Sequence, residues 1–405
     1  ANPGSWVSSA TAQRACWYPG SARQNVAVAR ERAHAVVPHT SKALVATLCG
    51  IEPRLHVPIT EATPDGIPGK CLARLLKETG YRTAFMQSAT QRFENRRTLV
   101  DNMGYDTFVP LERMDKKGWA KVNYFGNEDD IMLKPSEKWI DEVGDDPFLL
   151  TFLTLTPHHN YLAPRRYGRH DYDENDELNR YLNTIHYVDA FVNNVIEMFK
   201  RKGLYDDTIF VILGDHGEGF REHGRTQHDN VIWQEGLHVP LIVHDPTKFQ
   251  DGGKRVPWTS NQLDVVPTIA DLLGYEIKKA KFPGASLLSL DSHRTVRAHC
   301  WYERRCMAAI WGDHKLIYHF DQRPDEYFDL SKDPLEKNNI IDELQDLEKR
   351  RSDLIAWRTK VNALYRSHSE DRLQKYVTDQ PPVVEFPLDN VMFGDFVRLV
   401  GVEYP

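Results

Sequence analysis

The order of apolar runs along the chain constrains its fold more than any other feature. Runs rich in apolar and β-branched residues cover positions 81–89, 148–155, 209–213 and 239–246. The run at 148–155 is continuous, which is typical of a strand buried on both faces. Helix-like segments separate the runs, and this alternation predicts an α/β fold with a mostly parallel central sheet flanked by helices.

The expected helices have recognisable ends. Apolar residues at 72–80 follow helical spacing up to a glycine, and 262–274 ends in the same way. A long amphipathic helix is expected over 179–204, and a first helix over 21–37. In such sheets, ligands gather at the carboxyl ends of the strands.

The pattern changes at about residue 295. Residues 297–320 have the character of short antiparallel strands, and a charged helix is expected over 342–368. We therefore predict an α/β domain at 1–294 and a C-terminal subdomain at 295–405. The subdomain would hold a small antiparallel sheet, the charged helix and a tail.

Composition excludes several classes of protein. The net charge of −7 argues against a nucleic-acid partner, because such proteins carry a basic face. The sequence has no run of about 18 apolar residues, so no membrane span is expected. The five cysteines show no CxxC spacing, and we expect buried free thiols, with a Cys300–Cys306 pair across a hairpin as the alternative.

A polar segment directly follows the apolar run 209–213. Asp215 and His216 are adjacent, and on a strand they would point to opposite faces. A turn at Gly214 or Gly217 could bring both onto one ion. Because carboxylate plus imidazole suits zinc or manganese better than calcium, a divalent transition metal is expected here.

Two histidines elsewhere could reach the same edge of the sheet. His228 lies further along the glycine-rich loop and could return to the site, whereas Glu218, Glu222 and His223 are expected to be solvated. His158 follows the run 148–155, where ligands gather in α/β sheets. The alternative is that His158 belongs to an ordinary polar loop.

Thr40 precedes a helix-like run. Its hydroxyl would lie at a helix N-terminus, where backbone N–H groups and the helix dipole favour an anion. The alternative is that Thr40 or Ser41 only caps the helix.

Six segments, in order, resemble the sulfatase and alkaline phosphatase superfamily. The metal-binding segment of that superfamily is similar to "GDHGEGFREHG…HVPLIVHDP", and "TSKALVATLCGIEP" stands where sulfatases have "CxPSRxxLLTGxxP". The segments "LLKETGYRTAF", "HHNYLAP", "QLDVVPTIADLLG" with "FPGASLL", and "HKLIYHFDQRPDEYFDL" also resemble family segments. The resemblance covers roughly residues 25–360.

The resemblance implies a role for each matched residue. Thr40 would be the nucleophile and a metal ligand, and Asp215 and His216 would be metal ligands. His158 and His228 would hold the substrate oxyanion, protonate the leaving oxygen or bind a second metal. Lys42 is a further candidate for the anion. The resemblance also favours a periplasmic or extracellular location.

Two departures from the family pattern refine this expectation. Threonine cannot be converted to the formylglycine of sulfatases, so Thr40 resembles instead the nucleophile of phosphoethanolamine transferases and lipoteichoic acid synthases. The family's first strand should end in an acidic ligand upstream of residue 21, but positions 1–20 contain no Asp or Glu. We therefore expect the domain at 1–294 to lack that strand.

These features predict a metal-dependent hydrolase or transferase that acts on phosphoesters through Thr40. The first alternative is a sulfuric ester hydrolase that works without formylglycine. The second is a catalytically inactive, sulfatase-like binding protein. The expected partner is a small-molecule, lipid or glycan ester that carries negative charge.

Overall fold

The computed structural model describes residues 28–55, 59–249, 254–256, 258–278, 281–290, 293–302, 305–320 and 323–379. The expectation about an acidic ligand upstream of residue 21 lies outside these residues. The chain divides into two compact units, Ala1–Tyr365 and Arg366–Pro405. The predicted boundary between residues 294 and 295 is a different division, and it stays a prediction.

Two sheets form the centre of the first unit. The larger has the order β11 (Lys254–Val256), β1 (Val28–His34), β10 (His238–His244) and β7 (Phe210–Leu213), and β12 (Ser260–Asn261) also pairs with β1. The smaller is parallel throughout, in the order β3 (Thr107–Val109), β2 (Arg82–Gln87) and β6 (Phe148–Leu153). The α/β class is confirmed, with antiparallel pairing confined in these two sheets to the contacts of β10 with β1 and β7.

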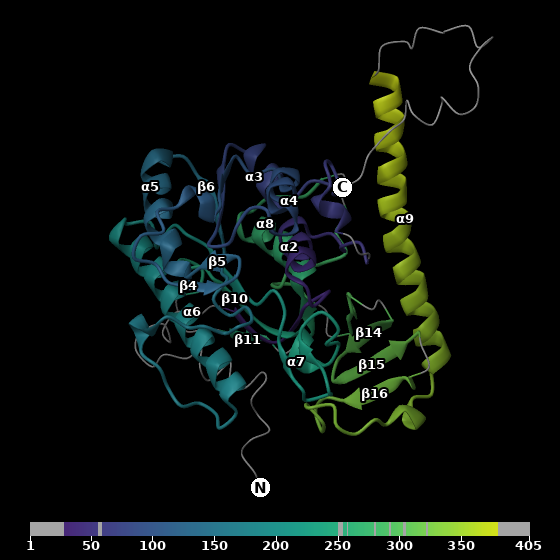
Figure 1. The fold of residues 1–405 in the computed structure, drawn as a ribbon. Helices are drawn as coiled ribbons and strands as arrows, with labels where there is room; N and C mark the ends of the chain where they lie inside the picture. The colour runs from purple at the N-terminus through teal and green to yellow at the C-terminus, as the bar shows by residue number, and fades with distance from the viewer. Residues whose placement is uncertain are drawn as a thin grey trace, which may run out of the picture. The chain divides into compact units, whose positions relative to one another are not determined.

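Helices cover both faces of the parallel sheet (Figure 1). The helices between residues 40 and 272 are α2 (Thr40–Cys49), α3 (Leu72–Lys77), α4 (Arg96–Met103), α5 (Leu133–Val143), α6 (Asp176–Arg201), α7 (Gln234–Leu237) and α8 (Val265–Leu272), of which α2 and α4 pack on one face of this sheet and α5 and α6 on the other. Phe85 of β2 packs with residues of α2 and α4, whereas its neighbours Ala84 and Met86 pack with α5 and α6. Side chains alternate across a strand, so β2 contributes to the core on both of its faces.

The first predicted helix is wrong. Residues 28–34 form strand β1, which lies between β10 and β11 in the larger sheet. Ala33 and Ala35 are buried in the core beneath it. The alanines and valines of this segment permit a helix, but pairing with two neighbouring strands outweighs that local preference.

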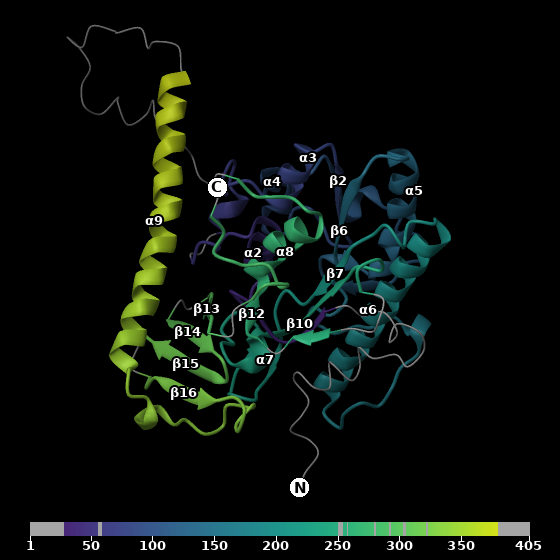
Figure 2. The ribbon, with the colours of Figure 1, turned by 180° about the vertical axis from the view of Figure 1, so that it is seen from behind.

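A separate antiparallel sheet follows in the sequence. Its strands are β13 (Thr295–His299), β14 (Cys306–Trp311), β15 (His314–His319) and β16 (Glu326–Asp329), and Figure 2 shows them side by side. Leu354, Trp357 and Val361 of α9 (Leu347–Asp379) belong to the same buried cluster as residues of β14 and β15. The sequence therefore predicted both the antiparallel strands and the charged helix.

Four cysteines form disulfides, which corrects the expectation of free thiols. Cys49 at the end of α2 is bonded to Cys71 before α3, and Cys300 is bonded to Cys306. The Cys49–Cys71 pair joins two helices across 22 positions of sequence, a separation that carries no signal of pairing. Cys16 lies outside the described residues.

The remaining elements are short, or connect the main ones. They are β4 (Lys121–Asn123), β5 (Gly126–Asn127), β8 (Gly219–Phe220), β9 (Thr226–Gln227) and the 3-10 helices η4 (Thr60–Ala62), η5 (Phe93–Asn95), η6 (Leu111–Arg113), η7 (Asp129–Met132), η8 (Arg165–Tyr167), η9 (Gln262–Asp264) and η10 (Ile341–Glu343). Within the described part of the chain, no helix is both long enough and apolar enough to span a membrane.

A buried ion pair fixes α2 to η4. Lys42 Nζ lies 2.6 Å from Glu61 Oε2, and both side chains are 0% exposed. Glu61 Oε1 also accepts hydrogen bonds from the backbone N–H of Arg54, at 2.6 Å, and from the Tyr365 hydroxyl, at 3.1 Å. Burial lowers the pKa of Lys42, and the neighbouring Glu61 opposes that shift. The pair thus compensates two charges that water cannot reach.

Removing one partner of this pair should destabilise the protein strongly. Lys42→Met leaves the Glu61 carboxylate buried without its cation, which costs about 3–5 kcal/mol of the free energy of unfolding. The double variant Lys42→Met/Glu61→Leu should recover most of that loss. Chemical denaturation of both variants checks this, and equal stability of Lys42→Met and the wild type would contradict the role of the pair.

Asp189 on α6 should make stability depend on pH. Burial raises the pKa of its carboxyl from 3.8 to about 6. The folded protein therefore holds this proton more tightly than the unfolded chain, and the group disfavours folding increasingly as pH rises from about 4 to about 6. Asp189→Asn should raise the melting temperature at pH 7.5, with a smaller gain at pH 5. A gain that is equal at both pH values would count against this assignment.

Candidate active site

One cavity collects most of the predicted site residues. It opens to solvent and has a volume of about 1150 Å³, its open mouth included. Thr40, His158, Asp215, His216 and His228 all line it. These residues come from the start of α2 and from the segments that follow β6 and β7. Their convergence agrees with the general placement of ligands at the carboxyl ends of strands in α/β folds.

Thr40 is the first residue of α2 and does not cap it. The N-cap is His39, whose backbone is extended at φ −159°, and no side chain caps the helix. Thr40 Oγ1 lies 3.3 Å from His216 Nε2, and Ser41 Oγ donates to Glu94 Oε2 at 2.5 Å. The capping alternative is therefore wrong, and the Thr40 hydroxyl faces the cavity.

A turn after β7 places Asp215 and His216 together. The backbone N–H of His216 donates to Asp215 Oδ1 at 3.0 Å, and Gln262 Nε2 donates to the Asp215 carbonyl at 2.6 Å. Gly217 lies so close to the next segment that a Cβ there would be 2.0 Å from the Glu235 carbonyl oxygen. Only glycine fits at this position, as the sequence pattern indicated.

The two side chains have the chemistry of metal ligands. His216 Nδ1 donates to the Gly217 carbonyl at 2.8 Å, so in the neutral ring Nε2 has its lone pair free for Thr40 or an ion. Burial lowers the pKa of His216. Burial would raise the pKa of Asp215, but its interactions with His216 and the Thr40 hydroxyl outweigh this and lower it. A neutral imidazole, a carboxylate and a hydroxyl thus fit a divalent cation.

Glu218 is a site residue that the sequence analysis missed. It is 6% exposed, and its carboxylate accepts from Tyr161 Oη at 3.0 Å and pairs with His228 Nδ1 at 3.2 Å. The ligand atoms of His216, Glu218 and His228 lie within 4.8 Å of one another, a second arrangement that could hold a metal ion. Glu218 was expected to be solvated because it lies in a glycine-rich polar loop of the sequence. Its burial becomes evident only in the folded structure.

His228 and His158 differ in charge. Burial would lower the pKa of His228, but the hydrogen bond to Glu218 and the charge of Glu218 raise the pKa of His228 to about 9. Burial lowers the pKa of His158 to about 4, with further lowering from His159 and His228. The rings of His228 and His216 stack at 4.0 Å between centroids. At neutral pH the cavity therefore holds a cationic His228 and a neutral His158.

Arg96 is a second residue that the sequence analysis missed. It is 3% exposed and lines the cavity, with Nη2 3.6 Å from Glu94 Oε2. Its Nη1 is buried with no hydrogen-bond partner in the described part of the chain. Burial would raise the pKa of Glu94, but His39 and Arg96 outweigh this and lower it to about 2. No pattern in "FENRR" distinguishes Arg96 from an exposed cation.

Lys42 is the one predicted site residue that lies elsewhere. It is fully buried in the ion pair with Glu61 and does not line the cavity. Two positions after Thr40 on a helix, its side chain points away from the Thr40 side chain. Arg96 and His228, rather than Lys42, supply positive charge to the cavity.

Curated relatives match part of the chain. The lipoteichoic acid synthase-like YvgJ of Bacillus subtilis is 30% identical over 229 residues, which cover 53% of this chain and 36% of that protein. The lipoteichoic acid synthase of Staphylococcus saprophyticus is 26% identical, over 55% of this chain and 35% of its own length. The chain thus spans about a third of the length of these relatives.

Solved structures share the fold over most of the chain. A protein of the alkaline phosphatase superfamily from Vibrio parahaemolyticus has a TM-score of 0.65 at 19% identity, covering 86% of this chain and 80% of that one. The lipoteichoic acid synthase LtaP of Listeria monocytogenes has a TM-score of 0.64 at 16% identity, covering 92% and 87%.

Two family models match the sequence. The model of the C-terminal part of N-sulphoglucosamine sulphohydrolase matches residues 222–355. The Sulfatase model matches residues 22–275, more than half of the chain. The strand tip at Asp215, the α2 N-terminus at Thr40 and this match agree, and the chain belongs to the sulfatase family.

Proposed function

We propose that this protein is a metal-dependent hydrolase or transferase that acts on phosphoesters, with Thr40 as nucleophile. The observation that carries the proposal is the placement of the Thr40 hydroxyl beside Asp215 and His216 in a cavity that also holds two cationic side chains. Similarity to lipoteichoic acid synthases supports a phosphoester over other esters.

A divalent metal fits the donor atoms at this position. Asp215, His216 Nε2 and Thr40 Oγ1 would hold it, and zinc or manganese suits this mixture of oxygen and nitrogen better than calcium. When bound, the ion supplies Lewis-acid chemistry that makes a hydroxyl a better nucleophile near neutral pH. His216, Glu218 and His228 form a second candidate set for a cation.

The side chains suit a double displacement at phosphorus. Thr40 gives up its proton, for which the Asp215 carboxylate and the His216 Nε2 lone pair are the neighbouring acceptors, and its oxygen forms a bond to phosphorus. The bond from phosphorus to the leaving oxygen breaks, and His228 donates a proton to that oxygen. Water or an acceptor alcohol then attacks the phosphoryl group on Thr40 and restores the hydroxyl.

The cavity also neutralises the charge of the ester. Arg96 and protonated His228 face the same space as Thr40, and the N-terminus of α2 adds backbone N–H groups. Fixed donors of this kind stabilise the equatorial oxygens most strongly when their charge increases during transfer. The proposed substrate is therefore an anionic small-molecule, lipid or glycan phosphoester.

A sulfuric ester hydrolase is the second candidate. The match to the C-terminal part of N-sulphoglucosamine sulphohydrolase favours it. Sulfate and phosphate groups share tetrahedral geometry, so Arg96 and His228 would hold either one. A sulfate monoester carries less negative charge and needs fewer cations, whereas this cavity holds two.

Turnover of matched esters tests the proposed function. With added manganese or zinc, we expect hydrolysis of nitrophenyl phosphate or its diester to exceed that of nitrophenyl sulfate. Thr40→Ala should lower the rate by about 10³-fold or more, because the covalent route is lost. Faster sulfate hydrolysis would favour the second candidate, and no turnover of any ester would contradict both.

Metal affinity tests the ligand assignment separately. Asp215→Ala should weaken binding of manganese or zinc by about 100-fold, since it removes the charged ligand. Glu222→Gln is the matched control, because this carboxylate lies in the same loop outside the cavity. Isothermal titration on both variants gives the comparison. Unchanged affinity in Asp215→Ala would mean that the ion binds elsewhere.

A further inference from the structure

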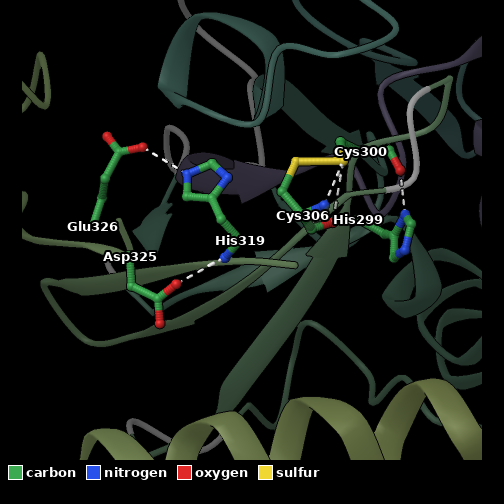
Figure 3. Close-up of a disulfide and its surroundings, with 6 residues drawn as sticks. All are labelled: His299, Cys300, Cys306, His319, Asp325 and Glu326. Carbon is green, nitrogen blue, oxygen red and sulfur yellow. Dashed lines mark hydrogen bonds and ion pairs between the residues drawn. A yellow bond between two sulfur atoms is a disulfide. The ribbon is translucent and has the colours of Figure 1, made fainter. Parts of the chain in front are cut away.

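A turn of the C-terminal sheet reaches the cavity. Strand β13 ends at His299, the disulfide joins Cys300 to Cys306, and strand β14 begins at Cys306 (Figure 3). The backbone N–H of Cys300 donates to the Cys306 carbonyl at 3.2 Å. His299 is tied to Val36 in the segment before α2, through a backbone hydrogen bond of 2.9 Å. The base of this turn is therefore held by covalent and hydrogen bonds.

Trp301 is the residue that this turn places in the cavity. It is 8% exposed and lines the same space as Thr40. Its ring stacks on His39, the residue before Thr40, with centroids 3.6 Å apart and planes 29° apart. Its backbone N–H donates to the Asp229 carbonyl at 2.9 Å, beside His228. Trp301 thus contacts the segments that carry both the proposed nucleophile and the proposed general acid.

Among the described residues, the indole N–H of Trp301 has no acceptor. Nε1 is buried, and no hydrogen-bond partner for it exists among the described residues. Indole nitrogen can only donate, and a buried donor without an acceptor is unfavourable. Arg96 Nη1, in the lining of the same cavity, is unpaired in the same way. Trp301 and Arg96 are thus two residues of the cavity lining that each carry an unpaired donor, and a ligand that brings oxygen atoms would satisfy both.

We propose that Trp301 is a substrate-binding residue, which donates its indole N–H to an oxygen of the bound ester. The Cys300–Cys306 disulfide serves this role by holding the turn that presents the indole ring. This inference rests on the proposed function for the identity of the ligand as an anionic ester. It assigns to the C-terminal sheet a direct part in the site that Thr40, Asp215 and His216 form.

Binding of inorganic phosphate by the 405-residue chain tests the proposal without requiring turnover. Trp301→Phe keeps an aromatic ring against His39 and removes the N–H together with part of the indole surface. We expect isothermal titration to show about tenfold weaker phosphate binding in this variant, the usual effect of losing a hydrogen bond to an anion. The melting temperature should change little, because a ring still packs on His39.

The two disulfides provide a matched pair of variants. Cys300→Ser/Cys306→Ser should weaken phosphate binding to a similar extent, because the turn that carries Trp301 loses its closure. Cys49→Ser/Cys71→Ser removes a disulfide that lies between α2 and α3 and should leave phosphate affinity unchanged. Titrations are carried out well below the melting temperature of each variant, so that folding does not enter the comparison.

The outcomes separate this inference from the proposed function. Equal phosphate affinity in Trp301→Phe and the wild type would overturn the role of the N–H, as would a wild-type protein that does not bind phosphate. Weaker binding in Trp301→Phe supports the inference, even where the wild type turns over no ester. A wild type that binds phosphate but turns over no ester would contradict the proposed function and leave this inference intact.

Discussion

The candidate site depends on how closely the chain after β7 approaches the segment before β10. Gly217 lies against the backbone at Glu235, where even one methyl group would clash. This contact fixes the chain directly after His216, where Asp215 and His216 line the same cavity as Thr40. Antiparallel pairing of β10 with β7 holds the strand before Asp215 beside the strand that follows Glu235, and β10 also pairs with β1. A side chain at 217 would separate the proposed nucleophile from the proposed metal ligands.

Charge in the cavity is arranged around this turn. The carboxylate of Glu218 keeps His228 protonated, and Glu94 is bonded to His39 and faces Arg96. Each cation that could hold an anionic oxygen is thus paired with a carboxylate, Glu218 being buried and Glu94 half-buried. Such pairs keep isolated charges from being buried at full cost. This arrangement suits an ester with more than one negative charge.

The sequence predicted the features that depend on local pattern. The strand at 148–153 and the convergence of Thr40 with Asp215 and His216 follow from apolar runs and family resemblance, and a glycine at 214 or 217 was expected to allow that convergence. Features that depend on distant contacts were not predictable. Strand β1 forms because β10 and β11 pair with it. Lys42 forms an ion pair with Glu61 instead of reaching the cavity. Glu218 is buried where it accepts a hydrogen bond from Tyr161. In each case the deciding partner is remote in sequence.

The central claim is that Thr40 becomes covalently phosphorylated during turnover. The direct measurement is rapid quenching of the protein with a phosphoester in the presence of manganese or zinc, followed by peptide mapping with mass spectrometry. The account predicts a phosphoryl group on the peptide that contains Thr40, absent from Thr40→Ala and formed no more slowly than product in the steady state. Product formation with an unmodified Thr40 peptide, or a phosphoryl group on another residue, would contradict it.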